Sequence, residues 1–105
     1  MEEMINFKGH TVDPAKVEEQ LYKNKHIFQA AVIGVKDENG EDTIKAYISL
    51  KDESRGKITS EDLLKWAKEN IPENEYPRQI VILDEVPTGT TGKVLRRQLK
   101  EREQK

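Results

Sequence analysis

The sequence contains no cysteine, which excludes a disulfide framework and any metal site built on thiolates. It has no apolar run approaching the roughly 20 residues that a membrane-spanning helix needs. Its first residues lack the basic and apolar regions of a signal peptide. Positive and negative charges nearly cancel, to a formal net charge of −2, so no overall attraction to nucleic acid or to an anionic membrane is expected. Together these absences favour a cytoplasmic protein.

The 105 residues suffice for one small domain with a modest core, and are too few to enclose a large substrate pocket. Charged residues make up 36% of the sequence and apolar residues 34%, yet the apolar residues gather in runs such as 27–35 and 80–83. This distribution indicates a folded domain with a heavily charged surface. We therefore expect a module and not a complete enzyme.

Alternating apolar and polar residues over residues 5–12 predict two short strands joined by a glycine turn. Asp13 follows as the expected N-cap of a helix whose inner stripe holds Val17 and Leu21. The acidic residues 18–19 are expected to lie near the positive end of the dipole of that helix. The chain thus begins with two strands and a helix.

Residues 27–35 form an apolar run that predicts a buried strand, and a turn at residues 37–40 separates it from a second strand at residues 43–50. Alternation along the second strand predicts that one face is buried and that the other, which carries Lys45, Tyr47 and Ser49, is exposed. We expect these two strands to pair as a hairpin.

A second helix is predicted from residue 59 or 60 to about residue 70, followed by a strand at residues 79–83 and a terminal helix at about 93–103. The predicted order is β-β-α-β-β-α-β-α. This order predicts one α+β domain, with a small sheet, a short N-terminal two-stranded element and about three helices.

The segment 86–97 carries one lysine on a loop rich in glycine and threonine that leads into a basic helix. Because Gly92 has no side chain, the loop can approach a ligand closely, and Lys93 is suited to neutralise a phosphate or a carboxylate. A phosphate-binding P-loop is excluded, since Pro87 stands where that motif needs glycine and Val94 stands where it needs serine or threonine. The alternative is an ordinary solvated lysine at a helix start.

Two further kinds of site have weaker support. The basic residues near the C-terminus are interrupted by glutamates and lack interleaved aromatic residues, so a solvated helix is favoured over a nucleic-acid interface. His10 and His26 are isolated in the sequence, which gives no ligand set for a metal. We therefore predict neither a nucleic-acid partner nor a metal site.

Three blocks of the sequence together resemble the C-terminal domain of the adenylate-forming enzymes, which include acyl- and aryl-CoA synthetases, luciferases and the adenylation domains of peptide synthetases. The blocks are residues 4–18, residues 31–35 with 44–47, and residues 76–97. The third block is specific, because a strand, a proline, a loop, Gly-Lys and a basic helix follow in the family's order and spacing. Its ending is most similar to fatty-acid and medium-chain acyl-CoA synthetases.

The resemblance implies a two-step reaction. A carboxylic acid attacks the α-phosphate of ATP to give an acyl-adenylate and pyrophosphate, and a thiol, here coenzyme A, then accepts the acyl group. Lys93 would be the catalytic lysine of the first step, with Gly92 and Thr91 supporting its loop. ATP, Mg²⁺ and coenzyme A would serve the full-length enzyme, and none of them is expected to bind tightly to this chain.

The resemblance also implies that residues 1–105 are a lid that rotates against a large N-terminal domain between the two half-reactions. Lys8, Gly9 and His10 would form the face that meets coenzyme A, and Glu2 would be the hinge residue. The expected partners are that domain and a small-molecule acid, and the chain alone is expected to be inactive. The alternatives are a free-standing module that binds phosphate or RNA, and the lid of an adenylation domain that loads a carrier protein.

Overall fold

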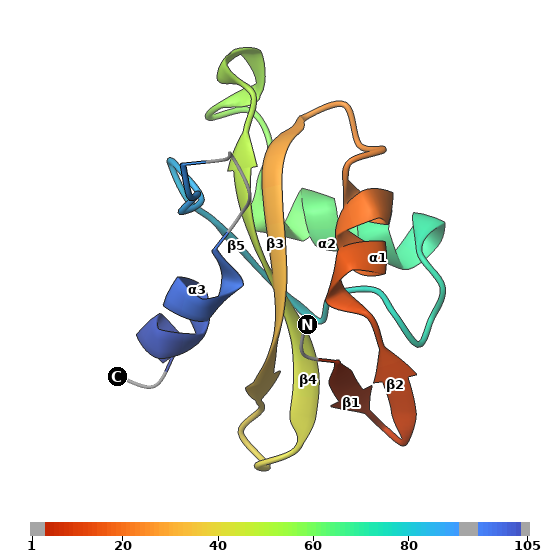
Figure 1. Cartoon of the computed structure of the whole chain (residues 1–105). Helices are drawn as coiled ribbons and strands as arrows, with labels where there is room; N and C mark the ends of the chain where they lie inside the picture. Colours follow the sequence, from red (N-terminus) through yellow and green to blue (C-terminus); the bar gives the residue numbers. More distant parts are fainter. Residues whose placement is uncertain (1–3, 91–94, 104–105) are drawn as a thin grey trace.

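The computed structural model describes residues 4–90 and 95–103. The predicted order of strands and helices is confirmed, and so is the α+β class (Figure 1). The elements are β1 (Ile5–Phe7), β2 (His10–Val12), α1 (Pro14–Leu21), β3 (Ile27–Lys36), β4 (Asp42–Leu50), a 3₁₀ turn (Asp52–Ser54), α2 (Ser60–Asn70), β5 (Gln79–Ile82) and α3 (Arg96–Glu103).

The strands form two sheets, a β1–β2 hairpin and a three-stranded sheet in the order β3-β4-β5. Strands β3 and β4 are antiparallel, which confirms the predicted hairpin, whereas β4 and β5 are parallel, with Ala46 opposite Ile80. A parallel pair needs a crossover connection, and α2 lies in the crossover between β4 and β5. Strand β3 is left at one edge of the sheet.

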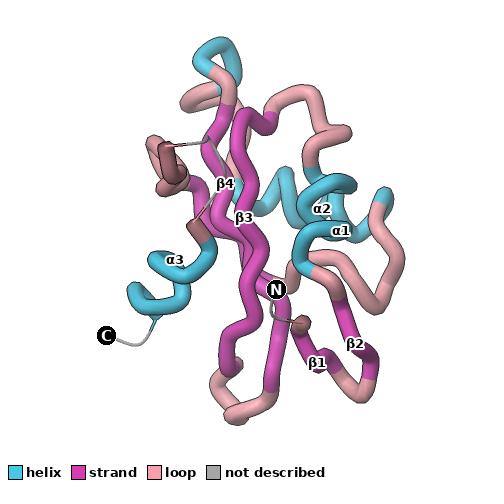
Figure 2. Tube along the Cα trace, viewed as in Figure 1, coloured by secondary structure: helices cyan, strands magenta, loops and turns pink. Residues whose placement is uncertain are grey.

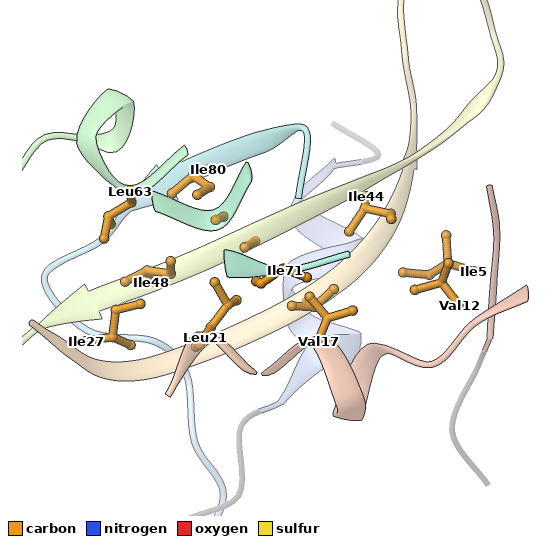
Figure 3. Close-up of a cluster of buried hydrophobic side chains, with 14 of the residues drawn as sticks. Ile5, Val12, Val17, Leu21, Ile27, Ile44, Ile48, Leu63, Ile71 and Ile80 are labelled. Carbon is orange, nitrogen blue, oxygen red and sulfur yellow. The ribbon is translucent and has the colours of Figure 1, made fainter. Parts of the chain in front are cut away.

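Helices α1 and α2 lie on one side of the sheet and α3 lies on the other (Figures 1 and 2). The larger core fills the space between the sheet, α1, α2 and the β1–β2 hairpin (Figure 3). It is built from aliphatic side chains that are almost fully buried, among them Val17, Leu21, Ile44, Ile48 and Leu63. The predicted inner stripe of α1 is thereby confirmed.

The second face of β4 is buried, so the prediction that it is exposed was wrong for Tyr47 and Ser49, which are 2% and 0% exposed. A separate apolar cluster covers this face, in which Tyr47 packs with Ala31, Ile33, Val86 and Leu99. Leu99 comes from α3, which returns across the sheet after β5. Alternation along a single strand could not reveal this, because the covering residues are about 40 to 50 positions away in sequence.

The first two helices begin with side-chain caps. Asp13 accepts a hydrogen bond from the backbone N–H of Ala15 at 3.0 Å, as predicted. Thr59 caps α2 in a capping box with Asp62, in which each side chain accepts from the other residue's backbone N–H. The backbone N–H of Thr59, and then its side chain, hold the pKa of Asp62 below its ordinary value.

Truncation of Leu99 tests the second core. We expect Leu99→Ala to lower the free energy of unfolding by about 2 to 4 kcal/mol, because it opens a cavity between α3 and the sheet. Phe28→Ala is the control, since that ring is 61% exposed and its loss should cost less than about 1 kcal/mol. If both variants lowered the free energy of unfolding in urea by the same amount, the assignment of Leu99 to a core would be contradicted.

Candidate functional site

The turn between β1 and β2 holds three of the predicted site residues. Phe7 and His10 are paired across the hairpin, so Lys8 and Gly9 form a two-residue connection. Their φ angles are +49° and +81°, which are the positive values that a type I′ turn requires at both central positions. Glycine adopts this conformation without steric cost, but lysine does not. Lys8 is therefore a strained residue on an exposed turn.

The base of this turn is packed against the segment before β5. The ring of Phe7 is buried, and its centroid lies 4.6 Å from the guanidinium carbon of Arg78. Arg78 also stacks on Tyr76 at 3.6 Å and donates to the carbonyl oxygens of Tyr76 and Glu73. A side chain added at Gly9 would meet nothing within 4 Å, so the outer surface of the turn is open. The turn thus combines a fixed base with an accessible tip.

The chain that leads toward Lys93 is tied to the sheet. Val86 is fully buried, and its backbone N–H donates to Oε1 of Gln29 at 3.2 Å. The same oxygen accepts from the Ser49 hydroxyl at 2.9 Å, so Gln29 joins this segment to both β3 and β4. Beyond the loop, the N–H of Leu95 donates to the carbonyl oxygen of Pro87 at 2.9 Å. The residues on either side of the loop are therefore hydrogen-bonded to each other.

A largely buried ion pair anchors the start of α3. Arg96 donates from Nε to Oε2 of Glu18 at 2.7 Å and from Nη2 to Oε1 at 2.5 Å. Oε2 of Glu18 also accepts from the backbone N–H of Val32 at 2.8 Å. The side chains of Glu18 and Arg96 are 9% and 21% exposed. One carboxylate on α1 thus binds edge strand β3 and the first residue of α3.

This ion pair corrects two predictions. Glu18 lies in the last turns of α1 and pairs with another helix, so it does not act on the dipole at the helix start. Helix α3 is not simply solvated, because Leu99 is buried and Arg96 is paired, while Arg97 stays exposed. The guanidinium of Arg96 donates two N–H groups to the carboxylate of Glu18. Arg96 therefore has a structural role and not the nucleic-acid contact considered above.

The sequence contains a pattern that indicates the burial of Glu18. Residues 14, 17, 18 and 21 follow the i, i+3, i+4, i+7 spacing of an inner helix face, and the structure buries all four. A charged residue at such a position needs a partner. Gln29 gave no comparable signal, because alternation along a strand does not reveal which loop returns to it.

Not every predicted site residue can be placed. Thr91, Gly92, Lys93 and Glu2 lie outside the described residues. The hairpin that carries Lys8, Gly9 and His10 lies on the side of the sheet with α1, and α3 begins on the opposite side (Figure 1). The described residues therefore put the Lys8 turn and the start of α3 on different sides of the sheet.

Within residues 4–90 and 95–103, no three His, Asp or Glu side chains come together in a way that could hold a metal ion. None of the helices in that part of the chain is long and apolar enough to cross a membrane.

Comparison with known proteins connects this geometry to one family. Residues 16–93 match the family model described as the AMP-binding enzyme C-terminal domain. The chain belongs to this family.

Curated relatives are much longer than this chain. A peroxisomal butyrate–CoA ligase of Arabidopsis thaliana is 32% identical over 94 residues, which cover 89% of this chain and 16% of that protein. A mitochondrial medium-chain acyl-CoA ligase of Danio rerio is 31% identical over 105 residues, which cover 100% of this chain and 17% of that protein. This chain therefore spans about one sixth of the length of these relatives.

Solved structures agree with the sequence comparison. An acyl-CoA synthetase of Brucella canis superposes with a TM-score of 0.84 at 30% identity, covering 97% of this chain and 19% of that one. An anthranilate–CoA ligase solved with anthranoyl-AMP gives a TM-score of 0.82 at 29% identity, covering 95% of this chain and 20% of that one.

The strained turn gives a stability prediction. We expect Lys8→Asn to raise the free energy of unfolding by about 0.5 to 1 kcal/mol, because asparagine tolerates the positive φ at this position better than lysine does. Asn6→Asp, on β1 outside the turn, is the control and should change it by less than about 0.5 kcal/mol. Destabilisation by Lys8→Asn in urea unfolding would show that the turn does not strain Lys8.

Proposed function

We propose that residues 1–105 are the C-terminal lid of an AMP-forming acid–CoA ligase and that a large N-terminal domain completes the active site. Family membership and the short share of each relative that the chain covers support this proposal. The observation that carries it is that Lys93 falls within the family match. The described residues before the loop are anchored to the sheet through Val86 and Gln29, and Arg96 after the loop is anchored to Glu18 on α1.

Lys93 is the proposed catalytic residue of the first step, with Gly92 and Thr91 supporting its loop. When a carboxylate attacks the α-phosphate, two anionic groups approach each other and charge develops on the phosphoryl oxygens. A lysine ammonium placed there stabilises this arrangement as a point charge. By analogy with lost oxyanion donors, its removal costs about 3 to 4 kcal/mol of barrier height.

Lys8, Gly9 and His10 are proposed to face coenzyme A in the second step. The turn suits this role, because its tip is open at Gly9 and its base is fixed by Phe7 and Arg78. Strain at Lys8 supports a functional reason for lysine at this position, since an asparagine would relieve it. Glu2 is proposed as the hinge residue.

The described residues fit coenzyme A better than they fit a metal. The open, cationic turn can lie along the phosphorylated thiol substrate, whereas no cluster of carboxylates in the described part of the chain suits Mg²⁺. We propose that the large domain binds ATP and Mg²⁺. Magnesium would neutralise phosphate charge there, and the task of this chain is to deliver Lys93.

The acid is proposed to be a fatty or medium-chain acid, and the thiol to be coenzyme A. A carrier-protein acceptor is the second candidate, because a nonribosomal peptide synthetase of Curvularia clavata is 32% identical over 114 residues. Thioester formation with coenzyme A or with a phosphopantetheinyl protein distinguishes the two. A cytoplasmic location stays a prediction.

In the full-length ligase, we expect Lys93→Ala to slow acyl-adenylate formation by about 10²- to 10³-fold, because the attacking anions lose their cation. Thioester formation from supplied acyl-adenylate should be nearly unchanged. Pyrophosphate release measures the first step, and acyl-CoA formation from synthetic acyl-adenylate measures the second. Lys16→Ala, on exposed α1 surface, is the control.

An equal loss of both half-reactions in Lys93→Ala would contradict a role confined to the first step. The purified 105-residue chain should show no turnover with ATP, acid and coenzyme A. Acyl-CoA formation by this chain alone would refute its assignment as a lid.

A further inference from the structure

We propose that Glu18 is a positioning residue for adenylation, which acts by fixing Arg96 and through it the segment that carries Lys93. This inference rests on the proposed function. It assigns to α1 a part in the first half-reaction that neither the family match nor the sequence pattern assigns to it.

The first argument is the geometry of the carboxylate. Both oxygens of Glu18 accept from the guanidinium of Arg96, and Oε2 also accepts from Val32 on the edge strand. Two parallel N–H bonds from a planar fork fix orientation as well as distance, which a single bond does not. Arg96 stands three positions after Lys93 in sequence, so a contact that holds the Arg96 side chain acts close to the lysine.

The second argument is burial. The Glu18 side chain is 9% exposed, and a pair buried to this degree often adds little net stability over an apolar pair of the same size. A carboxylate at this position is therefore better explained by the orientation that it imposes.

The third argument is a contrast within α3. The far end of the helix is also held by a carboxylate, since Glu103 accepts from Nζ of Lys45 at 2.6 Å and from the hydroxyl of Tyr47. That contact fixes α3 on the sheet but lies seven residues beyond Arg96. The two ion pairs secure the same helix, and only the one at Glu18 adjoins the predicted catalytic segment.

The test compares Glu18→Gln with Glu103→Gln in the full-length ligase. We expect Glu18→Gln to slow acyl-adenylate formation by roughly 10- to 100-fold, with little change in the KM for ATP or acid, because the lysine is misplaced and not removed. Thioester formation from supplied acyl-adenylate should change by less than about twofold. Glu103→Gln, which loses the contact with Lys45 at the far end of α3, should leave the rates of both half-reactions within about twofold of those of the parent.

A double-mutant cycle checks that Glu18 acts through Arg96. Arg96→Gln should slow adenylation like Glu18→Gln, and the double variant should be no slower than the slower single variant. In the 105-residue chain, Glu18→Gln should also speed hydrogen exchange at the amides of Leu95 and Gln98 relative to Glu103→Gln. Additive effects, or equal effects of Glu18→Gln and Glu103→Gln, would overturn the positioning role.

The same assays separate this inference from the function on which it rests. Normal adenylation by Lys93→Ala would refute the proposed function itself. Slow adenylation by Lys93→Ala together with normal adenylation by Glu18→Gln would refute the role of Glu18 alone.

Discussion

The β3–β4 hairpin buries side chains on both faces, and the rest of the fold follows from the need to cover both. Ile44 and Ile48 point to the side of α1 and α2, while Tyr47 and Ser49 point to the side of α3. Helices α1 and α2 cover only the first face (Figure 2). The chain must therefore return across the second face after β5, which brings Val86 and α3 to that side.

Covering both faces of a sheet still leaves the backbone N–H and C=O groups of its edge strands without strand partners. At β3, side chains from α1 and the residue after it bond some of these groups. Glu18 accepts the outward N–H of Val32, and the Tyr22 hydroxyl bonds both the N–H and the carbonyl oxygen of Ala30. An edge satisfied in this way is a poor template for pairing with another chain. Because Glu18 also binds Arg96, the contact that protects the edge is the one that joins the two faces.

Local chemistry allowed the elements, the caps and the hairpin to be predicted from sequence. The Asp13 cap involves a residue two positions away, and the β3–β4 hairpin is closed by a short turn between Lys36 and Asp42; both predictions were confirmed. The burial of Tyr47 and the partner of Glu18 depend on residues 40 to 80 positions away, for which a single sequence gives a pattern but no partner. At the candidate site, the motif order predicted the family. The anchoring by Gln29 and Glu18 emerged only from the structure.

Under the proposed function, a lid that serves two half-reactions must carry two functional segments and move them as one body. Phe7 holds the Lys8 turn against Arg78, which comes just before β5 in the sequence. Val86, which comes just after β5, holds the chain that leads toward Lys93 against Gln29. In the sequence, β5 therefore lies between Arg78 and Val86, and it pairs in parallel with the central strand β4. Under the proposed function, rotation about one hinge would then bring either segment to a reaction centre without repacking the core.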